Sequence, residues 1–242
     1  MEEKKYLRMT KNERIQHFLL LSTFITLVIT GFALKYPESF WVKWFVAIFG
    51  QYTFELRGVV HRIAAVGMII ASFYHILYIT FTKRGRQLVK DLWFYKQDLT
   101  DLFTSLKYLV NDSASKPKLG RFSYIEKAEY WAVVWGTIVM GATGTFLWFE
   151  NIFLPVIGMS GMQISTAVHW YEAILASLAI LVWHFYFIFL NPDVSPMNKA
   201  WITGHLSREQ MEHEHPRELE EIEKNIEEKY KREDKSNPAV EN

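Results

Sequence analysis

The stretch AVHWYEAILASLAILVWHFY, residues 167–186, is almost entirely apolar but carries two histidines, His169 and His184. They are fifteen residues apart, which is about 22 Å along an α-helix, and a bilayer's hydrocarbon core is roughly 30 Å thick. Fifteen steps of about 100° also bring the second side chain to within about 60° of the first. Ionisable groups at such depths are costly and mark functional sites by default. We therefore predict a transmembrane helix that presents one imidazole near each side of the membrane.

Three further apolar blocks accompany this one, and the charged residues lie between and after the blocks. We predict membrane spans over residues 15–34, 57–81, 128–149 and 166–190, each long enough to cross a bilayer. Aromatic residues make up 16% of the chain, which suits contact with membrane interfaces. The predicted fold is an all-α membrane protein, a four-transmembrane-helix up-down bundle surrounded by lipid. The net charge of +1 gives no sign of a nucleic-acid partner.

The segments between the spans are of two kinds. The N-terminus, the connection Lys83–Lys127 and the C-terminal tail are rich in Lys and Arg, whereas Ser39–Gly50 and Asn151–Ser165 carry almost none. The positive-inside rule then places both termini in the cytoplasm. Short interfacial helices are expected at Ser39–Gly50 and Asp98–Val110.

The charge pattern also divides the chain. We expect a membrane domain over residues 1–205 and a charged cytoplasmic tail over residues 206–242. Within the tail, Glu218–Lys235 is expected to be a solvated helix or disordered. For His213-Glu-His215 a solvated face is favoured over a metal site.

The chain has no cysteine, which excludes thiolate-ligated iron–sulfur clusters and haem attached through C-x-x-C-H. Histidine is therefore the candidate ligand of any redox centre. With the topology above, the histidines fall at two depths: His61 and His169 near the outer face, and His17, His75 and His184 near the inner face. A bis-histidine haem b needs one imidazole from each of two facing helices. We therefore infer two stacked haem b groups that carry electrons across the membrane.

The inner level holds one histidine more than a haem needs. His184 can pair with His17 or with His75, and the residues alone leave both open. His61 and His75 are fourteen residues apart, close to the spacing in the fourth span, which favours His75 by symmetry. Two arginines flank His61 and are candidates either to pair with haem propionates or to anchor the helix at the interface: Arg57 and Arg62. The alternative function is a haem-free membrane anchor, or a transporter bundle that relays protons through these histidines.

Short motifs along the chain resemble, in their order, those of one family. They are Arg14-Ile-Gln-His17, His61, Gly120–Lys127 (GRFSYIEK), Tyr130-Trp131, Thr143-Gly144, Gly204–Arg208 (GHLSR) and His215-Pro216-Arg217. Over roughly residues 14–221 the chain resembles the dihaem cytochrome b, or gamma, subunits of membrane-bound formate dehydrogenases. These are related to the cytochrome b subunits of nickel–iron hydrogenases and thiosulfate reductases.

The resemblance implies a ligand scheme. His61 and His169 would hold the outer haem, and His17 and His184 the inner one. His75 would then be spare, free to line a quinone site, carry protons or pack. The spacing of fifteen residues in the fourth span is one more than in the family, so a local helix irregularity or a tilted haem is expected.

The resemblance also implies a quinone site just before the third span. The family's asparagine there is replaced by Ser123, with Glu126 and Lys127 nearby as candidate proton carriers. Menaquinone or ubiquinone would be the substrate on the inner side. An iron–sulfur or multihaem cytochrome subunit, joined to a catalytic subunit, would dock at Ser39–Gly50 and Asn151–Ser165. We therefore expect an electron-transfer subunit of a respiratory complex in the bacterial inner membrane rather than a stand-alone enzyme.

Overall fold

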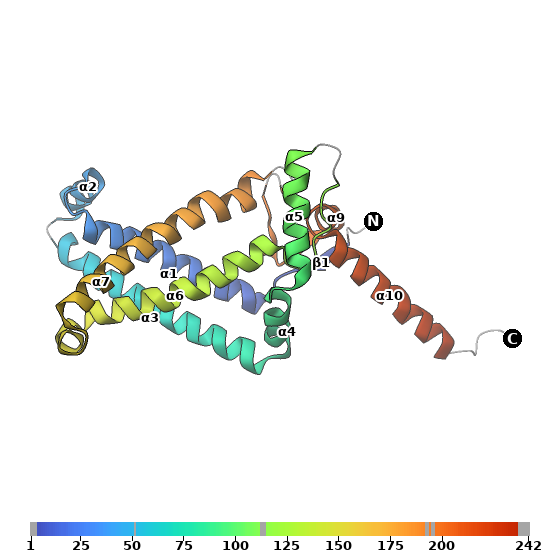
Figure 1. The fold of residues 1–242 in the computed structure, drawn as a ribbon, viewed down its shortest axis with the longest axis horizontal. Helices are drawn as coiled ribbons and strands as arrows, with labels where there is room; N and C mark the ends of the chain where they lie inside the picture. The colour runs from blue at the N-terminus through green and yellow to red at the C-terminus, as the bar shows by residue number, and fades with distance from the viewer. Residues whose placement is uncertain (1–3, 51, 112–114, 192–193, 195–196, 237–242) are drawn as a thin grey trace.

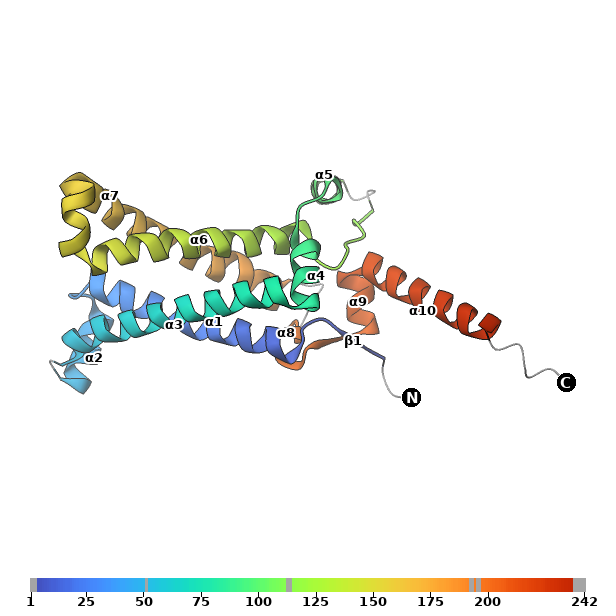
Figure 2. The ribbon, with the colours of Figure 1, turned by 90° about the horizontal axis from the view of Figure 1, so that it is seen from below.

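The computed structural model describes residues 4–50, 52–111, 115–191, 194 and 197–236. Four helices in this part of the chain are long and apolar enough to cross a membrane. They are α1 (Lys11–Lys35), α3 (Thr53–Phe81), α6 (Tyr124–Trp148) and α7 (Glu150–Leu178), the last continued by the π-helical segments η1 (Ala179–His184) and η2 (Tyr186–Leu190). The four run along the length of the molecule (Figure 1, Figure 2). This arrangement confirms the predicted all-α membrane bundle.

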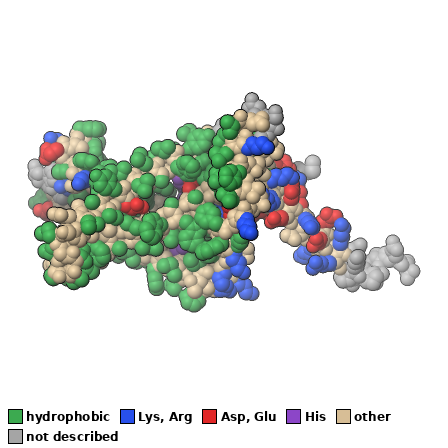
Figure 3. Space-filling model, viewed as in Figure 1, with side chains coloured by type: hydrophobic (Ala, Val, Ile, Leu, Met, Phe, Trp, Pro, Cys, Tyr) green, Lys and Arg blue, Asp and Glu red, His purple; other side chains and the backbone are tan. Residues whose placement is uncertain are grey.

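The spans pack as two pairs. α1 packs mainly against α3, and α6 against α7, whereas the backbones of the two pairs approach closely mainly between α1 and α7. Large apolar side chains cover the outside of the bundle (Figure 3); Ile70 and Leu181, for example, remain 63% and 66% exposed. Such a surface is unfavourable in water and is the expected one in lipid.

The shorter elements gather at the two ends of the bundle (Figure 1). α2 (Phe40–Phe49) and the first turns of α7 lie at one end, which we call the α2 end. The other end, called the α5 end, carries the remaining elements: α4 (Lys83–Leu92), α5 (Lys96–Val110), α8 (Ala200–Thr203), α9 (Arg208–Glu214), α10 (Pro216–Ser236) and the strands β1 (Lys5–Leu7) and β2 (His205–Ser207). The first and last described elements thus lie at the same end, as an even number of spans requires.

The helix α5 crosses the end of the bundle rather than extending it (Figure 1). Asp98 and Asp101 are buried toward the protein, whereas Leu99, Phe103 and Leu109 are exposed. An apolar outer face on a helix at this position agrees with the predicted interfacial helix.

Residues 151–165, which the predicted spans leave between them as a connection, are helical. α7 begins at Glu150 and bends at Gly158, whose φ of 70° lies outside the helical region. Pro155 is the sixth residue of this helix, where it cannot donate to the carbonyl four residues earlier. The physical reason for the helix is that an apolar segment at the membrane must satisfy its backbone groups internally.

The end of the fourth span contains the irregularity that the histidine spacing predicts. Residues 179–184 and 186–190 are π-helical, with backbone bonds to the fifth residue instead of the fourth. A π-helical turn takes up extra residues without reversing the face that the helix presents, so His184 can follow His169 at the longer spacing. The span ends at Leu190; Pro192, two residues further on, lies outside the described residues.

The tail folds back onto the N-terminal strand. β1 and β2 pair antiparallel, with Tyr6 opposite Leu206, and these two residues form a small buried cluster with Met211 and Leu219. The expectation of a solvated face is therefore wrong for His215, which is only 4% exposed. The reason is that the few apolar residues of the tail bury one side of it against β1, and His215 lies on that side.

Candidate functional site

His61 and His169 lie against matching features of the two helix pairs. Nδ1 of His61 is 2.9 Å from Oγ1 of Thr30 on α1, and Nδ1 of His169 is 2.9 Å from Oγ1 of Thr143 on α6. Each threonine is followed by a glycine. A Cβ atom at Gly31 would lie 3.4 Å from Cε1 of His61, and one at Gly144 would lie 3.2 Å from Cε1 of His169. The Thr-Gly dipeptide therefore lets an imidazole approach the neighbouring helix and gives its Nδ1 a partner.

The threonines also determine which nitrogen of each ring carries the proton. The hydroxyl of Thr30 donates to the carbonyl of Thr26 at 2.6 Å, and that of Thr143 donates to Val139 at 2.7 Å. Since a hydroxyl has one hydrogen, each threonine oxygen must accept from the Nδ1–H of its histidine. Nε2 then keeps its lone pair, and no described residue bonds it. An imidazole held through Nδ1 with Nε2 available is the arrangement of a metal ligand.

His17 and His184 form the second pair, nearer the α5 end. Nδ1 of His184 donates to the Oε2 atom of Glu129 on α6 at 3.1 Å. Nδ1 of His17 is buried without a hydrogen-bond partner among the described residues, and its ring lies 6.1 Å from that of Trp201. The two imidazoles are close enough for their charges to interact, as are those of His61 and His169. The structure thus places His17 near His184 and His61 near His169, and haem ligation by these pairs stays a prediction.

His75 differs from the other four histidines because both of its nitrogens have partners. Nδ1 donates to Oε1 of Gln16 at 2.7 Å, and Nε2 accepts from the hydroxyl of Tyr130 at 3.0 Å. The amide nitrogen of Gln16 in turn donates to Asn12, which orients the Gln16 oxygen toward His75. Both ring nitrogens are therefore occupied by side chains from α1 and α6.

These arrangements fit haem b as judged by the donor atoms. Four imidazoles on three spans form two pairs along the bundle axis, and Nε2 of each has no partner in the described part of the chain. Within that part no group of three or more His, Cys, Asp or Glu residues could hold a metal ion by itself. The pattern therefore suits a cofactor that needs two imidazoles per iron.

Arg57 and Arg62, the predicted propionate partners, make different contacts. A guanidinium nitrogen of Arg57 donates to the carbonyl of Ala33 at 2.8 Å. The guanidinium of Arg62 lies over the Trp148 ring, 5.5 Å from its centroid. Both contacts join α3 to a neighbouring span near the α2 end, and a role toward propionates stays a prediction.

Ser123, Glu126 and Lys127 lie at the start of α6. Ser123 caps the helix: its hydroxyl accepts from the backbone N–H of Glu126 at 3.2 Å, and the Glu126 carboxylate accepts from that of Ser123 at 2.7 Å. Such a capping box satisfies backbone donors that the helix leaves open. Lys127 forms a buried ion pair with Asp98 of α5 at 2.8 Å. All three residues thus have structural partners, and their contact with a quinone stays a prediction.

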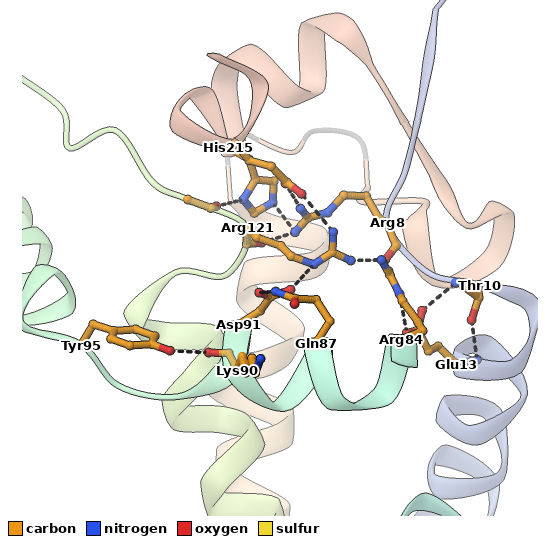
Figure 4. A network of polar contacts seen from close by, with 12 residues as sticks. Arg8, Thr10, Glu13, Arg84, Gln87, Lys90, Asp91, Tyr95, Arg121 and His215 are labelled. Carbon is orange, nitrogen blue, oxygen red and sulfur yellow. Dashed lines mark hydrogen bonds and ion pairs between the residues drawn. The ribbon is translucent and has the colours of Figure 1, made fainter. Parts of the chain in front are cut away.

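A network of charged groups closes the α5 end (Figure 4). Arg8 pairs with Glu218, Arg121 pairs with both Asp91 at 3.2 Å and Glu218 at 3.1 Å, and Arg84 pairs with Glu13 at 3.1 Å. Burial, together with the guanidinium groups of Arg84 and Arg8, lowers the pKa of Arg121 below its ordinary value. The network joins the N-terminal segment, α4, the connection before α6 and the tail.

His215 belongs to the same network (Figure 4). Its Nδ1 donates to the carbonyl of Gly120 at 2.8 Å, and its Nε2 accepts from Arg8 at 3.1 Å. Burial and the charge of Arg8 lower the pKa of the imidazole. His215 is therefore a neutral buried hydrogen-bonding group, not a solvated one.

Reasoning from the sequence did not identify the groups that hold the imidazoles: Gln16, Thr30, Glu129 and Tyr130. The recurrence of Thr-Gly at residues 30–31 and 143–144 is a signal that could have found Thr30. Tyr130 belongs to a motif that resembles the family, but neither it nor Glu129 is marked as a partner of a histidine. Contact with a histidine on another helix depends on how the helices are rotated.

Four membrane-spanning helices with two interhelical histidine pairs define a membrane cytochrome b. Residues 8–198 match the prokaryotic cytochrome b561 family, and the chain belongs to that family. It is 22% identical over 222 residues to the cytochrome b556(fdo) subunit of formate dehydrogenase from Escherichia coli K12. The matched region covers 92% of this chain and 95% of that subunit. The subunits of strains O6:H1 and O157:H7 match equally.

These matches confirm the predicted resemblance to formate dehydrogenase cytochrome b subunits. Family membership implies haem b and a part in electron transfer. Together with the four apolar helices it makes this a multi-pass protein of the bacterial inner membrane. The implied haem argues against the alternative of a haem-free anchor or transporter.

Proposed function

We propose that this chain is a dihaem cytochrome b subunit that connects a redox partner at one membrane face with the quinone pool at the other. His61 and His169 hold the outer haem b, and His17 and His184 hold the inner one. Each haem iron, when bound, takes up and releases one electron at a time. The observation that carries this proposal is that, within the described structure, His61, His169 and His184 are each held through Nδ1 alone, and Nδ1 of His17 has no partner among the described residues. Both nitrogens of His75, in contrast, are occupied.

The surrounding residues prepare the imidazoles for this task. Thr30, Thr143 and Glu129 accept from Nδ1–H and so keep the lone pair on Nε2. Outer-sphere acceptors of this kind also hold the ring orientation and increase its basicity. Gly31 and Gly144 provide the space in which two of the rings lie.

The orientation follows from the charges. We place the α5 end and both termini in the cytoplasm, since most of the Lys and Arg side chains in Figure 3 lie at that end or on the tail. Residues 1–205 form the membrane domain and residues 206–242 the cytoplasmic tail. An electron that crosses the full membrane potential is worth about 2.3 kcal/mol per 100 mV, so the direction of flow decides whether the reaction builds or uses that potential.

The two reaction partners lie at opposite ends. An iron–sulfur or multihaem subunit, joined to a catalytic subunit, docks at α2 and the first turns of α7. Menaquinone or ubiquinone reacts near the inner pair, at the start of α6 where Ser123 and Glu126 lie. Proton exchange with the quinone then takes place on the cytoplasmic side. The names of the Escherichia coli relatives, which are subunits of formate dehydrogenase, support such an assembly.

The ligand scheme is tested with His17→Ala and His75→Ala in the complex purified in detergent. Haem content is measured from the dithionite-reduced b-type absorbance and by extraction. We expect two haems per chain in the wild type and in His75→Ala, and loss of the inner haem in His17→Ala. Loss of a haem in His75→Ala but not in His17→Ala would reverse the inner assignment, and a wild type without b-type bands would overturn the proposal.

A further inference from the structure

The two histidine pairs differ in the charge of the groups that accept from Nδ1. Both members of the outer pair donate to neutral threonine hydroxyls, at 2.9 Å each. In the inner pair His184 donates to the carboxylate of Glu129 at 3.1 Å, while Nδ1 of His17 has no partner among the described residues. A charged acceptor is therefore present at one level only, and there on one ligand only.

No Lys or Arg side chain among the described residues forms an ion pair with Glu129. The side chain of Glu129 is only 21% exposed, and His184 is the one ion-pair partner that the described residues give it. Its second oxygen, Oε1, is buried and has no hydrogen-bond partner in the described part of the chain. A carboxylate in a membrane span is costly, and helix packing alone does not require one here. Its negative charge acts on the imidazole of His184 without being shared.

We propose that Glu129 is a positioning residue that acts on the inner haem through His184. By accepting from Nδ1–H it holds the ring and gives Nε2 more electron density. The inner haem is thereby held at a lower reduction potential than it would have with a neutral acceptor. This inference rests on the proposed function, because it needs His184 as a ligand of the inner haem.

The physical reason is the difference in charge between the two oxidation states. The ferric haem carries one positive charge more than the ferrous haem, so a nearby negative charge stabilises the ferric form. A more basic ligand acts in the same direction, and hydrogen bonding around the ligands is one of the means by which proteins set such potentials. Thr30 and Thr143 cannot do this, because a neutral hydroxyl supplies a hydrogen bond without a net charge.

The test is a redox titration of the purified complex, with the two haems followed by absorbance and by the g-values of their electron paramagnetic resonance. In Glu129→Gln the amide oxygen can still accept from His184, but the charge is gone. We expect the midpoint potential of the inner haem to rise and its g-values to change, with the outer haem unaffected. Glu172→Gln is the comparison variant, since it removes a carboxylate three residues from His169 that accepts no hydrogen bond from a histidine among the described residues. The inner haem should not respond to it, and any shift of the outer haem should be smaller than the shift of the inner haem in Glu129→Gln.

The converse variant keeps the inference testable if Glu129→Gln loses its inner haem. Thr143→Asp places a carboxylate beside Nδ1 of His169, and the potential of the outer haem should fall. The inference would be overturned if neither substitution changed the midpoint potential of either haem, or if both potentials shifted together in Glu129→Gln. The proposed function would not be affected by these outcomes. A wild type with fewer than two b-type haems would overturn the proposed function and the inference with it.

Discussion

The two ends of the bundle hold their histidines with different chemical groups. At the α2 end both helix pairs use the same device, a Thr-Gly dipeptide on one helix beside a histidine on the next. At the α5 end the two inner histidines have unlike surroundings, and a network of buried ion pairs lies close by. In the proposed function this difference gives the two haem sites unlike surroundings, with two neutral acceptors at the outer site and one charged acceptor at the inner site.

The largest effect is expected from removing one histidine of the pair nearer the α2 end. In the proposed scheme, His169→Ala removes one of the two imidazoles of the outer haem, and His61 is already used on the opposite side of the ring. We expect haem content to fall by half, with the spectrum of the inner haem retained. Haem extraction and the reduced spectrum of the purified complex check this. Retention of both haems would show that the outer pair does not bind iron.

The second prediction concerns a buried ion pair at the α5 end. Lys127→Ala leaves Asp98 buried without its cation; the two side chains are 8% and 9% exposed. Removing one partner of a buried pair costs about 3–5 kcal/mol, so thermal unfolding in detergent should occur at a clearly lower temperature. Lys118→Ala is the control, since its pair with Glu220 is 65% and 60% exposed and worth about 0–1 kcal/mol. Equal losses in the two variants would contradict the role given to the buried pair.

A third prediction tests whether the ring of His169 needs the space that Gly144 leaves beside it. Gly144→Val adds atoms where a Cβ would already lie 3.2 Å from the His169 ring, whereas a Cβ at Gly141, one turn earlier, would meet nothing within 4 Å. Overpacking costs about 1–3 kcal/mol, which corresponds to a weakening of haem binding by about 5-fold to 160-fold. Outer haem occupancy should drop in Gly144→Val and persist in Gly141→Val. The same occupancy in both would mean that the ring does not need this close approach.

The smallest effect concerns pH and the closure of the α5 end. The pKa of His215 is lowered from its ordinary value of 6.5 by burial first and then by Arg8. The unfolded chain therefore binds a proton more readily than the folded one. The stability that a neutral His215 contributes is complete above about pH 6.5 and is lost as pH falls toward the lower folded value.

The wild type should therefore unfold at a lower temperature in this acidic range. In His215→Gln the unfolding temperature should depend less on pH. Glu126 and Glu218 also act on the ring and raise its pKa, so Glu218→Gln should enlarge the acid sensitivity. An identical pH profile in the wild type and His215→Gln would assign the effect to other groups.

Much of the fold could be predicted because it depends on local sequence. The spans follow from hydropathy over about 20 residues, and the π-helical segments agree with the unusual spacing of His169 and His184. The missed features depend on other parts of the chain. Residues 151–165 are helical because the membrane leaves no other partner for their backbone, and His215 is buried because Tyr6 and Leu206 meet across two distant strands.

The sequence by itself determined that the histidines lie at two levels, because helix rise and the order of the spans convert residue number into depth. Only the tertiary structure decided how they pair. Whether His184 faces His17, and whether Nε2 of His75 meets Tyr130, depends on the rotation of each helix about its axis. That rotation is set by contacts between helices far apart in the sequence, such as Gln16 with His75 and Glu129 with His184. Depth along a span is therefore encoded locally, whereas partnership between spans is encoded by packing.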